Sequence, residues 1–136
     1  MAARILIVED EMLVACELEA VLEDLGHEPV GIAPDLPSAL QLADVGIDLA
    51  LVDLNLRDGL TGPEIGASLC QDGVAVLFVT ANPRILGDGI DGAIGVITKP
   101  TDERSVASAV AYALRVKQGD VQAAPPSCLR LFKRAA

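Results

Sequence analysis

Residues 4–11 read Arg-Ile-Leu-Ile-Val-Glu-Asp-Glu, an apolar run that stops at three consecutive acids. Four more short apolar runs follow, at residues 29–33, 49–52, 74–79 and 94–97. Stretches with helical spacing of apolar residues separate these runs, so the pattern predicts five strand–helix units. Several runs are apolar at nearly every position, which is typical of strands covered by helices on both faces. We therefore predict an α/β fold with a doubly wound, five-stranded parallel sheet.

The segments between the runs predict where the helices lie. The first helix is indicated by an apolar stripe with helical spacing, formed by Val14, Leu18, Val21, Leu22 and Leu25. A second helix is expected to begin near Asp35 and a third near Pro63. The last helix is expected from about Asp102 to Lys117, with Thr101 as its N-cap.

Two segments depart from this pattern. Residues 81–92 contain Asn82, Pro83 and three glycines, which disfavour a continuous helix, so we expect a loop or a short, mobile helix there. Residues 119–136 contain two adjacent prolines and no strand-like run. We therefore expect one folded domain over residues 1–118 and a flexible C-terminal extension, residues 119–136, that adds little stability. We do not expect these residues to form a further folded domain, because they are too few for a winged helix or a catalytic domain.

The composition narrows the classes of partner. The chain has 136 residues, 51% of them apolar, and a formal net charge of −10. Such a charge repels phosphates, which argues against a nucleic-acid or anionic membrane surface, although it attracts Mg²⁺ or a basic partner. The three cysteines have no CxxC spacing, and no apolar run approaches the ~18 residues that span a bilayer. We expect a cytoplasmic protein.

Polar side chains follow the apolar runs where the strands should end. Glu9 and Asp10 follow the first run, Asp53 the third, Thr80 the fourth and Lys99 the fifth. The carboxyl ends of parallel strands meet at one edge of the sheet, and three acids there favour Mg²⁺, which prefers oxygen ligands. Lys99 and Thr80 would then contact an added phosphoryl group, an arrangement that suits phosphoryl transfer to a carboxylate. Each of these residues alone would be an ordinary cap or loop residue. The hypothesis of a phosphoryl-transfer site depends on all of them lying at the ends of neighbouring strands.

Four sequence motifs contain the polar residues at these strand ends. They are Ile-Leu-Ile-Val-Glu-Asp-Glu at 5–11, Leu-Val-Asp-Leu-Asn-Leu at 51–56, Phe-Val-Thr-Ala at 78–81 and Ile-Thr-Lys-Pro at 97–100. On these motifs the chain resembles the receiver domains of two-component response regulators over about residues 3–118. The resemblance implies a flavodoxin-like sheet with the strand order 2-1-3-4-5.

The resemblance also implies a role for each site residue. Asp53 is the expected phosphoacceptor, and Mg²⁺ is the expected cofactor. The implied metal ligands are Asp10 directly, Glu9 through water, Asp53 itself and the backbone carbonyl of Asn55. The implied contacts of the phosphoryl oxygens are the Thr80 hydroxyl, the Ala81 backbone N–H and the Lys99 ammonium. The peptide bond between Lys99 and Pro100 is expected to be cis.

One position departs from the family pattern. The aromatic residue that the family usually has three positions before the lysine is Val96 here, so the usual coupled movement of threonine and aromatic ring cannot operate. Residues 78–86 instead resemble an α-proteobacterial group of receivers with an irregular fourth helix, which includes stand-alone regulators and general stress response regulators. Partners of that group include histidine kinases of the HWE class.

The expected function is that of a single-domain response regulator rather than an enzyme. It takes a phosphoryl group from a sensor histidine kinase or a histidine phosphotransfer protein, with self-phosphorylation and hydrolysis as ancillary chemistry. Output is expected through protein contact or phosphorelay, not DNA binding, on the face made by residues 81–92, the strand at 94–97 and the last helix. A homodimer is left open.

Two other functions agree less well with the sequence. Asp53-Leu-Asn55 resembles the nucleophile motif of haloacid dehalogenase-type phosphatases, but the second aspartate of that motif is missing and the chain is short for that family. A pseudo-receiver that serves only as a scaffold is disfavoured because Asp53, Thr80 and Lys99 are all present.

Overall fold

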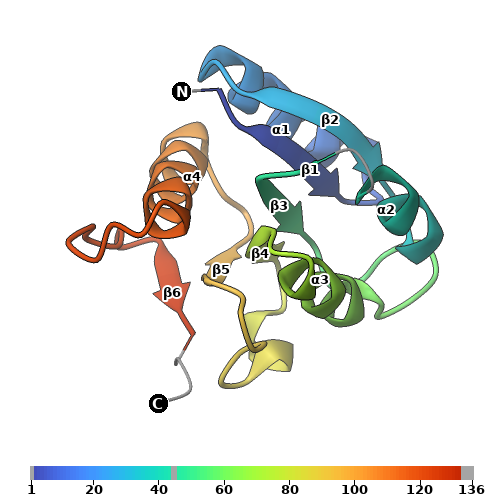
Figure 1. Ribbon diagram of the computed structural model, residues 1–136. Coiled ribbons are helices and arrows are strands. Elements are labelled where there is room, and N and C mark those ends of the chain that lie inside the picture. The colour runs from blue at the N-terminus through green and yellow to red at the C-terminus, as the bar shows by residue number, and fades with distance from the viewer. Residues whose placement is uncertain (1, 44–45, 133–136) are drawn as a thin grey trace.

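The computed structural model describes residues 2–43 and 46–132 (Figure 1). Strands and helices alternate along most of the chain, as the apolar runs predicted. The elements are β1 (Arg4–Val8), α1 (Met12–Asp24), β2 (Glu28–Ala33), α2 (Leu36–Leu42), β3 (Leu49–Val52), α3 (Gly62–Gln71), β4 (Ala75–Thr80), the 3₁₀ helix η2 (Pro83–Leu86), β5 (Gly95–Thr98), α4 (Glu103–Lys117) and β6 (Leu129–Leu131).

The strands form one sheet in the order β2-β1-β3-β4-β5-β6. β1 to β5 all pair in parallel, and β6 pairs antiparallel with β5. The prediction of a doubly wound, five-stranded parallel sheet with the order 2-1-3-4-5 is therefore confirmed, with one further strand at its edge. In this arrangement the carboxyl ends of β1, β3, β4 and β5 lie side by side.

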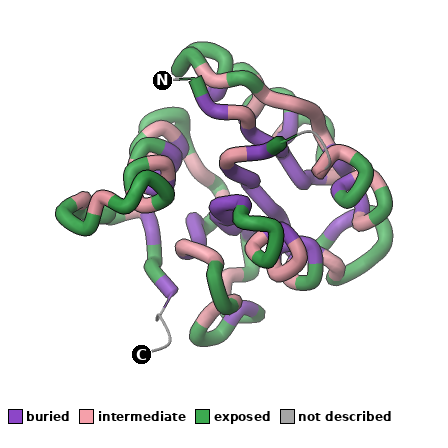
Figure 2. The backbone as a smooth tube through the Cα atoms, in the orientation of Figure 1, coloured by how far each residue is buried: buried purple, intermediate pink, exposed green. Residues whose placement is uncertain are grey.

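The helices cover the sheet on both faces, and the central strands are buried (Figure 2). Alternate residues of each strand belong to two separate apolar clusters, because successive side chains in a strand point to opposite faces. Ile5 and Ile7 lie in the cluster that α1 and α4 cover, whereas Leu6 and Val8 lie in the cluster that α2 and α3 cover. This double coverage explains why the strands are apolar at nearly every position.

Two aspartates cap the N-termini of helices. The Asp35 carboxylate accepts a hydrogen bond from the Ser38 N–H at 3.0 Å at the start of α2. The Asp102 carboxylate accepts one from the Ser105 N–H at 2.7 Å at the start of α4. The prediction that Thr101 is the cap of the last helix is wrong, because the extended backbone of Asp102 (φ −112°, ψ 170°) places its own carboxylate against the first turn.

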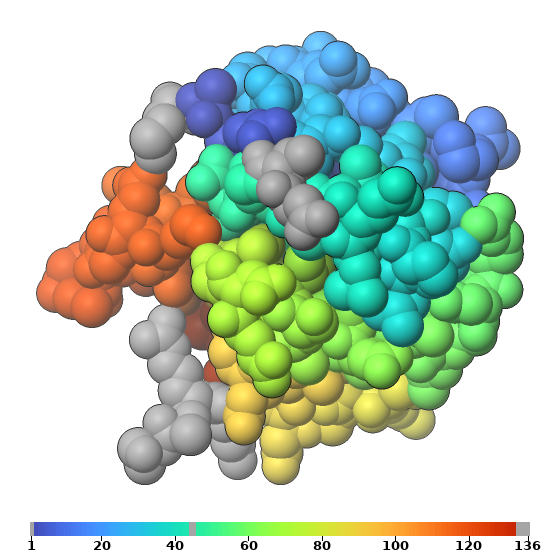
Figure 3. Space-filling model, turned by 45° about the vertical axis from the view of Figure 1, so that its right-hand side comes forward, coloured from blue at the N-terminus to red at the C-terminus, as the bar shows by residue number. Residues whose placement is uncertain are grey.

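The segment after β4 contains only a short helix, as predicted. η2 spans Pro83–Leu86 and is followed by turns in which Gly87 and Gly89 have φ of 52° and 119°. Residues with a Cβ atom are strained at such positive φ angles, so glycine is favoured at both positions, and Gly87 forms the C-cap of η2. Figure 3 shows this segment, in yellow, along one edge of the molecule next to α3.

The C-terminal extension contains a strand, and the prediction that it contains none is wrong. Leu129 pairs with Ile97 and Leu131 pairs with Gly95 in an antiparallel ladder. Leu129 and Phe132 are both only 7% exposed. A three-residue strand is too short to show a period in the sequence, and the partner of this one is the otherwise unpaired edge of β5. Residues 133–136 lie outside the described residues, and the domain division at residue 118 stays a prediction.

No helix in the described part of the chain is both long enough and apolar enough to cross a membrane.

Candidate functional site

The strand ends bring the predicted site residues to one edge of the sheet. Glu9 directly follows β1, Asp53 directly follows β3 and Lys99 directly follows β5, while Thr80 is the last residue of β4. Because β1, β3, β4 and β5 are consecutive neighbours in the sheet, residues separated by up to 90 positions in the sequence become adjacent.

Three acids form a cluster that fits a divalent cation. Glu9, Asp10 and Asp53 each offer a carboxylate oxygen, and these oxygens lie within 4.8 Å of one another. Glu9 is 1% exposed and Asp53 is 9% exposed, whereas Asp10 is more open to solvent. An all-oxygen set with one open side is the donor type that Mg²⁺ takes, since this ion keeps several of its waters.

Lys99 joins two of the acids. Its ammonium donates a hydrogen bond to Glu9 Oε1 and another, at 2.8 Å, to Asp53 Oδ2. Burial alone would lower the pKa of Lys99, but the hydrogen bonds to Asp53 and Glu9 outweigh it and hold the pKa above its usual value. Lys99 therefore stays charged and partly neutralises the cluster.

The pKa of Glu9 is raised by its surroundings in the cluster. Burial raises its pKa above the usual value for a glutamate, and the nearby charge of Asp53 raises it as well. The hydrogen bonds from Lys99 and from the Glu11 backbone N–H, the latter at 3.2 Å, oppose this shift without cancelling it. A cation at the site would favour the ionised form of Glu9.

The Asp53 carboxylate is held at both oxygens. Oδ1 accepts a hydrogen bond from the Leu54 N–H at 2.7 Å, and Oδ2 is the oxygen that Lys99 contacts. Behind it, α3 begins so close to β3 that a Cβ on Gly62 would lie 2.0 Å from the Asp53 carbonyl oxygen. Gly62 is thus a positioning residue that the sequence analysis missed, and a glycine directly before the helix-starting Pro63 was its only signal.

Thr80 lies at the next strand end. The residue is 1% exposed, and its hydroxyl oxygen accepts a hydrogen bond from the Asn82 N–H at 3.1 Å. The Lys99 N–H donates to the Thr80 carbonyl at 2.8 Å and so ties β4 to β5 beside the site. The next residue, Ala81, is exposed.

Two more sequence predictions concern the surroundings of the site. The Lys99–Pro100 peptide bond is cis, as predicted. Asn55 is exposed in the loop after β3, two residues beyond Asp53, and the role of its carbonyl as a metal ligand stays a prediction. Val96, at the position where an aromatic residue was expected from the family, is 1% exposed in β5.

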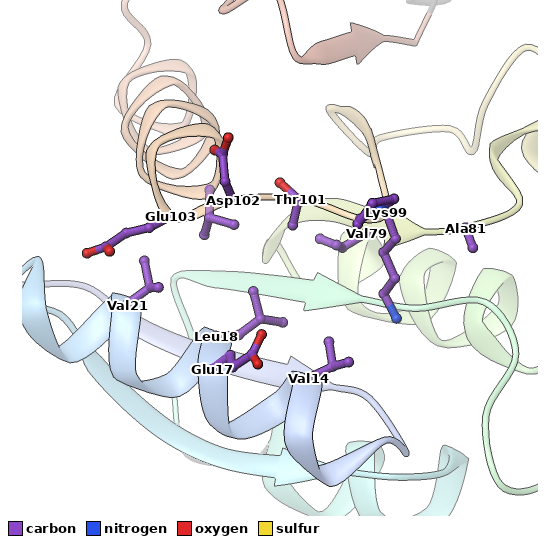
Figure 4. A pocket seen from close by; sticks show the side chains of 12 residues that line it. Val14, Glu17, Leu18, Val21, Val79, Ala81, Lys99, Thr101, Asp102 and Glu103 are labelled. Carbon is purple, nitrogen blue, oxygen red and sulfur yellow. The ribbon is translucent and has the colours of Figure 1, made fainter.

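A groove of about 380 Å³ opens beside Lys99, between α1 and the start of α4 (Figure 4). Val14, Leu18 and Val21 point into it from α1. Acidic side chains stand at its rim, among them Glu17 and Glu103. The site is therefore flanked by an apolar surface with a negatively charged border.

Comparison with known proteins identifies similar sequences and folds. Residues 5–111 match the family model described as response regulator receiver domain. The chain is 36% identical over 123 residues to the phyllosphere-induced regulator PhyR of Methylorubrum extorquens, which covers 87% of this chain and 46% of that protein. The chain spans about half the length of the curated relatives it matches.

Two solved structures of PhyR proteins are also similar to this chain. The crystal structure of the response regulator PhyR from Brucella abortus is similar with a TM-score of 0.79 and 32% identity, over 88% of this chain and 50% of that one. The solution structure of the receiver domain of PhyR from Erythrobacter litoralis is similar with a TM-score of 0.77 and 31% identity, over 93% of this chain and 96% of that one.

Proposed function

The chain belongs to the response regulator receiver domain family of two-component signalling, and from this we propose that Asp53 accepts a phosphoryl group from a phosphohistidine of a partner protein. The observation that carries the proposal is the placement of the Asp53 carboxylate: it lies at a strand end, within 4.8 Å of two further acids and in contact with Lys99. A neighbouring positive charge and a site for a cation are what phosphoryl transfer to a carboxylate requires.

In the proposed reaction a carboxylate oxygen of Asp53 forms a bond to phosphorus. The bond between phosphorus and the donor histidine nitrogen breaks, and that nitrogen keeps the electron pair. The Lys99 ammonium neutralises one phosphoryl oxygen, and the Thr80 hydroxyl and the Ala81 N–H bind the others. Together with Asp53 these groups come from the ends of three neighbouring strands, β3, β4 and β5, and such an arrangement would favour transfer by positioning them around the phosphoryl group.

We propose Mg²⁺ as the cofactor of the site. Asp10, Asp53 and the Asn55 carbonyl would hold it directly and Glu9 through water, which agrees with the all-oxygen donor set of the cluster. The ion would supply positive charge against the oxygens of the phosphoryl group. Lys99 supplies such charge from the chain itself.

Receiver domains are generally non-enzymatic signalling domains. Self-phosphorylation from small phosphodonors and slow hydrolysis of the aspartyl phosphate are proposed here as ancillary reactions. The rival assignment, a haloacid dehalogenase-type phosphatase, needs a second aspartate two residues after the nucleophile, and that residue is Asn55.

The proposed phosphodonor is a sensor histidine kinase, of the HWE class by resemblance, or a histidine phosphotransfer protein. The apolar groove beside Lys99 supports this, because it offers a partner helix a surface next to the acceptor. Output is proposed through protein contact or phosphorelay at the face made by η2, β5 and α4, and the net charge of −10 disfavours nucleic acid. The three free cysteines agree with a cytoplasmic location.

Phosphotransfer profiling tests the proposal. Each histidine kinase of the source organism is autophosphorylated with labelled ATP and mixed briefly with the wild-type chain or with Asp53→Asn. We expect one or a few kinases to transfer label rapidly to the wild type and none to transfer it to the variant. Transfer from no kinase, or equal transfer to both chains, would contradict the proposal.

A further inference from the structure

The outer edge of β5 is covered by the chain's own C-terminal strand. β6 pairs with β5 through Leu129, Arg130 and Leu131, and the Phe132 N–H extends the ladder with a hydrogen bond to the Ile94 carbonyl at 3.1 Å. Gly95 allows this close approach: a Cβ there would lie 2.4 Å from the Arg130 carbonyl oxygen. The edge of β5 is thus shaped to receive a strand.

Phe132 anchors this strand in a notch beside η2. Its ring centroid lies 6.0 Å from that of Phe78 on β4, and it lies where a Cβ on Gly89 would be, with Cγ only 2.3 Å away. The residue is 7% exposed and belongs to the same apolar cluster as Val96 and Leu86. The notch therefore selects an aromatic or other large apolar side chain.

Arg130 supplies the polar part of the contact. Its guanidinium donates hydrogen bonds to the Gly87 carbonyl at 3.1 Å and to the Pro83 carbonyl at 3.2 Å, and its Cζ lies 5.7 Å from the centre of the Phe132 ring. These carbonyls bracket η2, and the exposed acids Asp88 and Asp91 lie in the same segment. The surroundings of the edge therefore favour a basic strand.

The contact made by β6 is small and its connection is irregular. The strand has three residues, whereas strands in globular proteins usually have about five or six. Residues 119–128, which join it to α4, contain no helix or strand. Such a segment can detach without disturbing the five parallel strands, which leaves the edge of β5 open for pairing.

We propose that the edge of β5, together with the notch beside η2, is a docking site for an extended strand of a partner protein, and that β6 occupies this site as an intramolecular competitor. The partner strand would pair antiparallel with β5 and carry an arginine two residues before an aromatic residue, the spacing of Arg130 and Phe132. Main-chain pairing supplies affinity and the two side chains supply selectivity, as in other cases of strand addition to a sheet edge. The inference holds for the unphosphorylated chain and does not depend on Asp53.

A peptide with the sequence of residues 126–136, labelled with fluorescein, is the probe. Its binding to four chains of residues 1–136 is followed by fluorescence anisotropy: the wild type, Phe132→Ala, Leu131→Ala and the double variant Phe132→Ala/Gly95→Ala. Leu131 is the matched control because it lies in the same strand but is 41% exposed. A second peptide, in which alanine replaces the residue corresponding to Phe132, tests the notch.

The tethered strand should compete as though it were present at roughly millimolar concentration. We therefore expect the peptide to bind Phe132→Ala at least about tenfold more tightly than it binds the wild type or Leu131→Ala. The added Gly95→Ala should abolish this binding, because its Cβ blocks the ladder for any strand. The peptide without the aromatic ring should bind no chain.

Circular dichroism of each chain verifies that its fold is intact, and Gly95→Ala in an otherwise wild-type chain gives a second route to a displaced β6. Equal peptide binding to all four chains, or no binding to Phe132→Ala while it stays folded, would overturn the proposal. A wild-type dimer at micromolar concentration that Gly95→Ala dissociates would overturn the choice of a foreign partner, since a second copy would then be the occupant.

Discussion

Replacing Lys99 with methionine should destabilise the chain, and added Mg²⁺ should reverse part of the loss. The substitution keeps the length of the aliphatic chain but removes the ammonium that contacts Glu9 and Asp53. The side chains of these acids are only 2% and 11% exposed, so water cannot take the place of the lost charge. Two carboxylates would then face each other without a counter-ion.

The size of the effect follows from these contacts. Two charges about 4 Å apart interact with about 4 kcal/mol at the effective dielectric constant of a protein surface, and removing one partner of a buried ion pair costs about 3–5 kcal/mol. Glu9 limits the loss, because burial raises its pKa and the carboxyl can take up a proton. We expect a decrease in the free energy of unfolding of about 3 kcal/mol at pH 7.

Urea denaturation followed by circular dichroism measures this decrease, since the chain has no tryptophan to serve as a fluorescent probe. Lys117→Met is the matched control, because the Lys117 side chain is exposed and its ammonium donates a hydrogen bond to a neutral group, the Gly73 carbonyl, at 2.9 Å. We expect its effect to stay within about 0.5 kcal/mol. A tenfold excess of Mg²⁺ over its dissociation constant adds about 1.4 kcal/mol of stability.

Mg²⁺ should stabilise Lys99→Met more than the wild type, because it no longer competes with the ammonium for the carboxylates. The reasoning would be refuted if Lys99→Met and Lys117→Met lost the same stability. It would also be refuted if Mg²⁺ stabilised the wild type and Lys99→Met equally.

Three further predictions concern the rest of the chain. Hydrogen bonds from Ser38, and a smaller effect of Arg57, hold the pKa of Asp35 at about 2, below the usual 3.8. Its stabilising effect is therefore present above pH 3.8 and is lost as the pH falls through 2. In urea titrations Asp35→Ala should be less stable than the wild type at pH 7, and the difference should shrink as the pH falls from 3.8 to below 2. Phe132→Ala should cost about 2–3 kcal/mol, less than the about 3–5 kcal/mol of a central phenylalanine because the tail can detach rather than leave a cavity, whereas Leu131→Ala should cost under about 0.5 kcal/mol; equal losses would show that the notch does not hold the ring. Beryllofluoride, a phosphoryl mimic, should increase hydrogen-exchange protection of residues 81–92 in the wild type but not in Asp53→Asn, and protection confined to the loop after β3 would place the switch elsewhere.

The sequence predicted the part of the molecule that follows from local patterns. Continuous apolar runs located the five parallel strands, and acids directly after two of those runs located the cluster of Glu9, Asp10 and Asp53. The roles of these residues needed the family resemblance, because a carboxylate after a strand is by itself an ordinary loop residue.

The features that the sequence analysis missed depend on contacts between distant residues. β6 has three residues and no period, and Phe132 can occupy its place only because Gly89 has no side chain to clash with it. Gly62 matters because α3 starts against the backbone of Asp53. Thr101 and Asp102 are both good caps by type, and the backbone conformation of Asp102 decides between them.

The most direct test of the account is to locate the phosphoryl group. The wild-type chain is incubated with acetyl phosphate and Mg²⁺, the aspartyl phosphate is reduced with borohydride to a stable homoserine, and the peptides are sequenced by mass spectrometry. The account predicts that the modification falls on Asp53 alone and disappears when Mg²⁺ is chelated. Modification at Asp10 or Glu9, or undiminished labelling of Asp53→Asn, would contradict it.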